Sequence, residues 1–162
     1  MEGNKKYKEA IELKRQYDEI WDTLTTEDRI KKVKNRILCL SKAAYLGHEQ
    51  AQYELACFYK YGIYSDGSFF LSNKRKYIFW MNKSAENKYP PAVEWMAILY
   101  ESEPKIQDFE KAKAHYELYD SLMGIKMSKN RRLFLQQLDK GLFIKNKKGN
   151  YELVSNWKKL IR

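Results

Sequence analysis

The feature that most constrains the fold is an internal repetition at a spacing of 41 residues. When the chain is shifted by this distance, residues 40–59 fall on residues 81–100. The identical positions are Lys42/Lys83, Ala44/Ala85, Ala51/Ala92, Ala56/Ala97 and Tyr59/Tyr100. Small residues recur where two helices would cross closely, and large ones recur where they would fill the seam. The repetition therefore indicates pairs of packed helices.

Helical periodicity dominates the chain, with apolar residues recurring three and four positions apart. It predicts helices over residues 5–24, 28–46, 49–61, 74–87, 90–103, 108–123 and 128–141. Thr25 or Thr26 can cap the second helix by accepting a hydrogen bond from a backbone N–H. The stop signals are Gly47, Gly62 and Gly124. Residues 63–73 break the pattern, and we expect their apolar side chains to pack under the neighbouring helices; these are Phe69, Phe70 and Leu71.

Two structures compete for the C-terminal segment. Residues 142–154 could form a hairpin around Lys148 and Gly149. Residues 151–161 also fit a helix, with Val154, Trp157 and Ile161 on one face. We prefer the helix, because two strands alone make a marginal unit.

The repeated segment resembles a Sel1-like repeat, a family related to tetratricopeptide repeats. The matching residues are Lys42-Ala43-Ala44, Gly47-His48, Ala51-Gln52-Tyr53, Leu55-Ala56, Tyr59 and Gly62. Ala56 departs from the family pattern, which has glycine there. A second copy is degenerate, and residues 108–116 resemble the opening of a third. The likeness covers residues 30–124, and the insertion at 63–73 is longer than the family's usual linker.

The resemblance implies an all-α fold, a right-handed α/α solenoid of antiparallel helix pairs with capping helices at both ends. We expect one domain over residues 1–162. Residues 1–27 would form the N-terminal cap, 28–124 the repeats and 125–162 a basic C-terminal capping region. The family further implies a partner-binding role with no intrinsic chemistry.

Catalytic and metal-binding patterns are weak in this chain. Two cysteines, Cys39 and Cys57, do not make a disulfide framework. Zinc needs about four N or S ligands, and the chain offers two Cys and two His in total, with both cysteines at core-facing helix positions. Cys57 lies at a core-facing position, which does not suit a nucleophile. Glu101 and Glu103 flank a helix end, where solvation is the simpler interpretation. We expect no enzyme, no cofactor and no metal.

Location follows from what the sequence lacks. The N-terminal residues are polar, without the apolar core of a secretory signal. No run of eighteen apolar residues is present to support a membrane span. We expect a cytoplasmic protein with no membrane insertion.

The net charge of +10 is concentrated in residues 125–162, which hold eleven Lys or Arg against two Asp or Glu. Such a segment attracts phosphate, anionic lipid or an acidic protein surface. The alternative is that these charges form only the solvated face of a capping helix pair.

Candidate binding residues combine aromatic and basic side chains. Aromatics on the first helix of each pair would line the concave face, although packing competes for about half of them. The candidates are Tyr77, Trp80, Tyr116, Tyr119, Arg131, Arg132, Lys147 and Lys148.

The sequence leaves two function hypotheses open. The first is a bacterial adaptor that grips another protein, in concrete form an immunity protein that neutralises a cognate toxin with an acidic surface. The alternative is a nucleic-acid-binding protein or a regulatory adaptor that acts through the basic residues 125–162.

Overall fold

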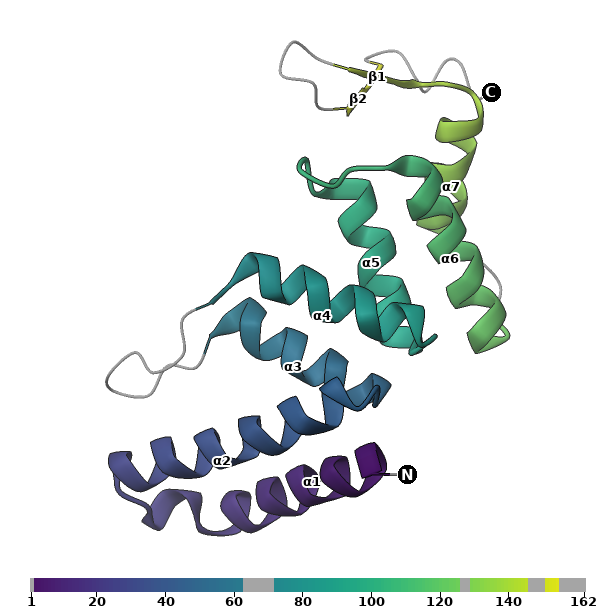
Figure 1. The fold of residues 1–162 in the computed structure, drawn as a ribbon. Coiled ribbons are helices and arrows are strands. Elements are labelled where there is room, and N and C mark those ends of the chain that lie inside the picture. Colours follow the sequence, from purple (N-terminus) through teal and green to yellow (C-terminus); the bar gives the residue numbers. More distant parts are fainter. Residues whose placement is uncertain (1, 63–71, 126–128, 146–150, 155–162) are drawn as a thin grey trace. The chain divides into compact units, whose positions relative to one another are not determined.

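A computed structural model describes residues 2–62, 72–125, 129–145 and 151–154. Within them the chain is all-α, with seven α-helices, one short 3-10 helix and two three-residue strands (Figure 1). The chain divides into two compact units, Met1–Ala92 and Val93–Arg162, called here the N-terminal and C-terminal units. None of the described helices is long and apolar enough to cross a lipid bilayer.

The seven helices expected from periodicity are confirmed. The elements are α1 (Glu2–Ile20), η1 (Trp21–Thr23), α2 (Thr26–Tyr45), α3 (Glu49–Tyr61), α4 (Lys74–Glu86), α5 (Pro90–Ser102), α6 (Phe109–Met123), α7 (Lys129–Asp139), β1 (Phe143–Lys145) and β2 (Tyr151–Leu153). Figure 1 shows α1, α2, α3 and α4 side by side, each antiparallel to the one before. The expectation for Phe69, Phe70 and Leu71 falls outside the described residues.

Side-chain caps fix where several helices begin. The Oγ1 atom of Thr25 accepts a hydrogen bond from the Asp28 backbone N–H at 3.2 Å. Asn73 caps α4 through the Lys76 N–H at 3.0 Å. Each such cap satisfies an otherwise unpaired donor and contributes about 1 kcal/mol. Of the two threonines that could cap α2, the structure selects Thr25.

The turn that closes each helix pair is the same in both copies of the repeat. The His48 N–H donates to the Ala43 carbonyl at 3.0 Å, and 41 residues later the Tyr89 N–H donates to the Ser84 carbonyl at 3.1 Å. Gly47 holds a left-handed φ of +86°, and Lys88 holds the equivalent position at +60°. The lysine pays a conformational cost that glycine avoids.

Polar side chains tie these two turns together. The Ser84 hydroxyl donates to the Glu49 carbonyl at 2.7 Å, and the Asn87 amide donates to the Gln52 side chain at 2.9 Å. Gln52 is 3% exposed, and its own amide donates to the Ala44 carbonyl at 3.0 Å. The buried amide is satisfied, so these contacts fix how α4 meets α3.

The repeated small residues lie in the core, as the shift of 41 residues indicates. Ala51, Ala56, Ala92 and Ala97 are all 0% exposed. Without larger side chains at these positions, neighbouring helices can approach closely. In the C-terminal unit the core is mainly aromatic and combines Phe109, Tyr116, Phe134 and Leu135 with Ala97 and Ala112.

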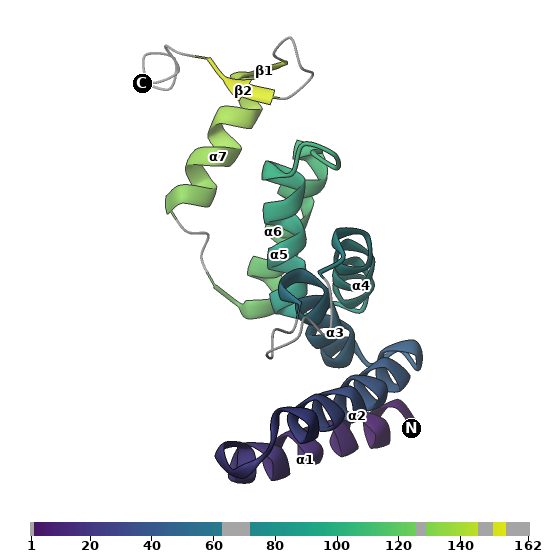
Figure 2. The same ribbon diagram turned by 90° about the vertical axis from the view of Figure 1, so that its left-hand side faces the viewer.

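The preference for a helix from residue 151 is wrong where the structure describes it. Residues 151–153 form β2, which pairs antiparallel with β1 in the register Phe143↔Leu153. The strands lie at the end of α7 (Figure 2). The Phe143 and Tyr151 rings lie 4.5 and 4.7 Å from the Phe109 ring, so the hairpin gains the packing that an isolated pair lacks. Residues 155–161 and the turn at 148–149 lie outside the described residues.

Candidate partner-binding surface

Three of the predicted binding aromatics are core residues. Tyr77 and Trp80 are each 5% exposed, and Tyr116 is 4% exposed. Tyr77, Trp80 and Ser84 share the face of α4 that is turned inward. Burial raises the pKa of Tyr77 to about 12. These three side chains pack in the core, so the prediction that they contact a partner is corrected.

The structure brings three of the predicted residues together, but inside the C-terminal unit. The Arg131 guanidinium lies 4.9 Å from the Tyr116 ring and 4.7 Å from the Tyr119 ring. It forms a salt bridge of 2.8 Å with Asp120 and another with Glu94. The Arg131 side chain is only 14% exposed. This arginine holds α5, α6 and α7 together and does not face solvent.

The remaining sequence candidates differ in their exposure to solvent. Tyr119 is partly buried against Arg131. Arg132 is exposed on α7. Lys147 and Lys148 lie outside the described residues.

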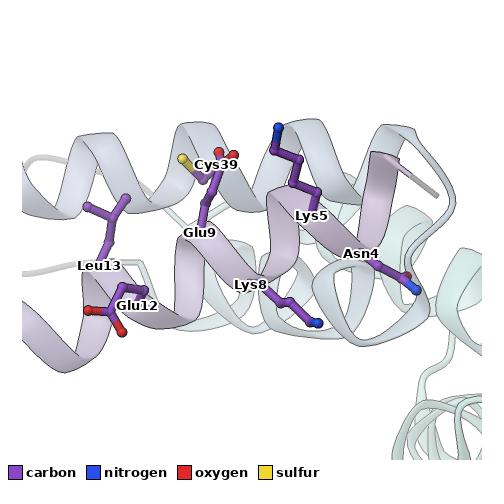
Figure 3. Close-up of a pocket in the computed structure, with 7 residues that line it drawn as sticks. All are labelled: Asn4, Lys5, Lys8, Glu9, Glu12, Leu13 and Cys39. Carbon is purple, nitrogen blue, oxygen red and sulfur yellow. The ribbon is translucent and has the colours of Figure 1, made fainter.

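A groove of about 850 Å³ runs between α1 and α2 (Figure 3). Its lining residues are Asn4, Lys5, Lys8, Glu9, Glu12, Leu13 and Cys39. The Glu9 carboxylate, which lines this groove, pairs with Lys6 at 2.8 Å. No histidine lines the groove to activate the thiol. Across the described part of the chain, no cluster of three His, Cys, Asp or Glu residues could hold a metal ion.

The remaining reactive side chains have structural roles. His48 caps α3 by accepting a hydrogen bond from the Ala51 N–H at 3.3 Å, and its ring stacks on Tyr7 at 4.1 Å. Burial raises the pKa of the Cys57 thiol, which is opposite to what a nucleophile needs. Glu101 accepts a hydrogen bond of 2.6 Å from the Tyr116 hydroxyl instead of being wholly solvated.

An exposed apolar surface lies on α2 and α4 of the N-terminal unit. Tyr45 is 78% exposed, Leu38 59% and Phe79 50%. The Tyr45 and Phe79 rings meet the buried Trp80 ring edge to face, at 4.9 and 5.1 Å between centroids. This geometry is favourable for aromatic pairs and holds the two exposed rings in place.

Exposed cations flank the apolar residues on both helices. On α2 the order is Lys34, Leu38 and Lys42; on α4 it is Arg75, Phe79 and Lys83. Members of each set are four residues apart and so share one helix face. The two sets coincide when the chain is shifted by 41 residues, and all six side chains are exposed. These six residues with Tyr45 are called here the α2/α4 surface.

No known relative helps to assign this surface. No protein-family model, no curated protein and no solved structure matches the chain. The function must therefore be inferred from the geometry and charge of the surface itself.

Charge separates between helices in the N-terminal unit. Helix α2 carries six Lys or Arg against two acidic residues, both in its first turn, and α4 carries four against one. Helix α1 is balanced at five against five, and α3 has one against two. The net charge of the whole chain does not show this pattern, because the acidic residues of α1 and α3 offset the cations of α2. The 41-residue shift carries a signal of the shared basic positions, because it pairs Lys34 with Arg75 and Lys42 with Lys83.

Proposed function

We propose that this chain is a non-enzymatic protein-binding module that holds its partner on the α2/α4 surface. The observation that carries the proposal is the exposure of Leu38 and Tyr45 on α2 and of Phe79 on α4, with exposed cations on the same two helices. The Tyr45 and Phe79 rings both contact the Trp80 ring. An apolar centre with a polar rim is the usual anatomy of a protein interface, and aromatic residues supply most of its binding energy. Contiguous exposed apolar residues on a protein surface mark interaction sites.

The proposal also includes the arrangement and handedness of the helix pairs. We propose a right-handed solenoid of Sel1-like helix pairs with capping helices at its ends. Support comes from the 41-residue repetition and from the equivalent hydrogen bonds in the turns at Gly47 and Lys88. Repeats of this kind bury apolar faces by stacking and leave a continuous surface for partners.

The biological role that we propose is that of an adaptor, in its most concrete form an immunity protein for a cognate toxin. The basic α2/α4 surface supports this form, because an acidic toxin surface would complement it. Growth arrest by the captured partner alone, relieved by co-expression of this chain, would establish it.

The test places a photo-crosslinking amino acid at Phe79 and identifies the protein attached to it in source cells. The double variant Tyr45→Ser, Phe79→Ser should lose the partner, because its apolar anchors are gone. The matched control is Ile11→Ser with Ile20→Ser on α1, where both side chains are 41% exposed. Loss of the partner in the control and retention in the α2/α4 variant would overturn the proposal.

The alternative proposal is nucleic-acid binding through residues 125–162. The enclosure of Arg131 counts against it, because this cation already pairs with Asp120 and Glu94. Nuclease treatment of the crosslinked sample separates the two proposals. A nucleic-acid adduct that depends on residues 125–162 would favour the alternative.

A further inference from the structure

The α2/α4 surface contains the same arrangement twice. Each helix presents a cation, an apolar side chain and a second cation at intervals of four residues. At a rise of about 1.5 Å per residue, each charge lies about 6 Å along the helix from its apolar neighbour. The Tyr45 ring of α2 and the Phe79 ring of α4 both contact the Trp80 ring, so the two exposed rings lie close together.

Part of the positive charge on this surface is not neutralised by salt bridges among the residues that the structure describes. Lys42 and Arg75 form no salt bridge with any residue that the structure describes. Lys83 pairs with Glu86 at 2.9 Å, but both side chains are about half exposed, so this pair is weak. A ligand with carboxylates could therefore gain these cations at little cost to the fold.

The surface is poorly suited to a second copy of this chain. Two such surfaces facing each other would oppose lysine with lysine and arginine with arginine. Like charges across an interface are unfavourable and exclude the wrong partners. The occupant must instead carry negative charge and apolar side chains together.

We propose that the α2/α4 surface binds an acidic segment of its partner protein. Apolar side chains of the segment cover Leu38, Tyr45 and Phe79, and its carboxylates reach the cations on either side. The segment crosses both helices, since both carry the pattern. This inference rests on the proposed function and specifies the chemistry of the partner.

Single-stranded nucleic acid also combines negative charge with apolar faces, but the geometry favours a peptide. Base stacking requires open aromatic faces. Leu38 has no ring and the neighbouring Trp80 is only 5% exposed, so Tyr45 and Phe79 are the only rings that this surface offers to bases. Aliphatic and aromatic side chains of a peptide can cover such a mixed surface more completely.

The test is selection of binders from a displayed library of random peptides of about 16 residues, long enough to cross two helices. The full chain is the target, and the double variant Tyr45→Ser, Phe79→Ser is used to remove peptides that bind elsewhere. We expect the enriched peptides to carry net negative charge and at least two large apolar residues. Their affinity should fall at least about tenfold in Lys42→Glu, Arg75→Glu.

The charge-matched control is Lys5→Glu, Lys8→Glu, two exposed lysines on α1, which should retain the affinity of the native chain. Enriched peptides that are neutral or basic would overturn the acidic chemistry while leaving the surface as a binding site. Enriched peptides that bind the double variant Tyr45→Ser, Phe79→Ser as tightly as the native chain would instead overturn the proposed surface. Failure to enrich any peptide counts against the acidic segment, whereas the crosslinking at Phe79 judges the proposed function independently.

A fluorescein-labelled single-stranded oligothymidine is the final probe. Tighter binding of this probe than of any selected peptide, lost in both α2/α4 variants, would assign the surface to nucleic acid and overturn the inference.

Discussion

The two units use similar residues in opposite ways. In the N-terminal unit, Arg75 and Phe79 lie in solvent on the same face of α4. In the C-terminal unit, Arg131 is enclosed between two tyrosine rings and paired with Asp120 and Glu94. The number of basic and aromatic residues in a segment therefore does not indicate a binding site. What decides whether such residues can bind a ligand is whether the fold already provides partners for them.

This difference has a physical cause. Burying an arginine removes its hydration, and only well-placed carboxylates restore the lost energy. Helices α5 and α6 supply those carboxylates around Arg131. Helix α2 has no acidic residue after its first turn, and Lys42 and Arg75 form no salt bridge with any residue that the structure describes.

The largest effect should come from removing the enclosed arginine. Arg131→Met leaves Asp120, whose side chain is 12% exposed, without its cation. We expect the free energy of unfolding of the C-terminal unit to fall by about 3 kcal/mol. Native-state hydrogen exchange in α6 measures this. Arg75→Met, in the N-terminal unit, should change stability by less than about 0.5 kcal/mol, and equal losses in both variants would break the comparison.

The next effect is a loss of stability at alkaline pH from buried tyrosines. Burial, and then the hydrogen bond of 2.6 Å to Glu54, raise the pKa of Tyr7. Burial and the hydrogen bond to Glu101 raise the pKa of Tyr116. Unfolded tyrosine ionises near pH 10 and the folded residues only at higher pH, so this stability is complete below about pH 10 and falls above it.

The slope should reach about 1.4 kcal/mol per pH unit for each tyrosine. Urea denaturation followed by circular dichroism between about pH 9 and pH 11 measures it. Tyr7→Phe should flatten the dependence for the N-terminal unit, and Tyr116→Phe for the C-terminal unit. An unchanged slope in either variant would show that the tyrosine does not contribute.

A smaller effect compares the two copies of the turn. Lys88→Gly should stabilise the chain by about 1 kcal/mol, because glycine adopts the left-handed conformation at little cost. Gly47→Ala should destabilise it by a similar amount. A Cβ atom at Gly47 would meet nothing within 4 Å, so this cost is conformational and not steric. Thermal unfolding of both variants tests the pair, and a destabilised Lys88→Gly would refute the equivalence of the turns.

The smallest effect on stability is expected at the exposed ring of α4. Phe79→Ser should lower the free energy of unfolding by no more than about 1 kcal/mol, since half of this side chain is already in water and the other half packs on Trp80. Denaturant titration checks this value. A loss comparable with that of Arg131→Met would show that Phe79 belongs to the core.

Local signals in the sequence were sufficient for the helices. Apolar spacing with caps such as Thr25 and stops such as Gly47 placed their ends within a few residues, and residues 49–61 agree with α3. The hairpin was considered but not preferred, because its packing comes from Phe109, more than 30 residues before Phe143. Such contacts leave no local pattern, whereas residues 151–161 also have helical spacing.

The site was harder to predict than the fold. Periodicity identified Tyr77 and Trp80 as members of one helix face, but not that this face is turned inward. Leu38 and Phe79 looked unremarkable singly, and only the neighbouring helices determine that they are exposed. Their equivalence under the 41-residue shift was nonetheless available in the sequence.

The polar contacts between the two turns separate architecture from recognition. Ser84, Gln52 and Asn87 join α4 to α3, and none of them belongs to the α2/α4 surface. Residues 34, 38, 42, 75, 79 and 83 can accordingly change while this joint stays intact. A lineage could exchange one partner for another through a few substitutions at these positions, with the scaffold inherited unaltered.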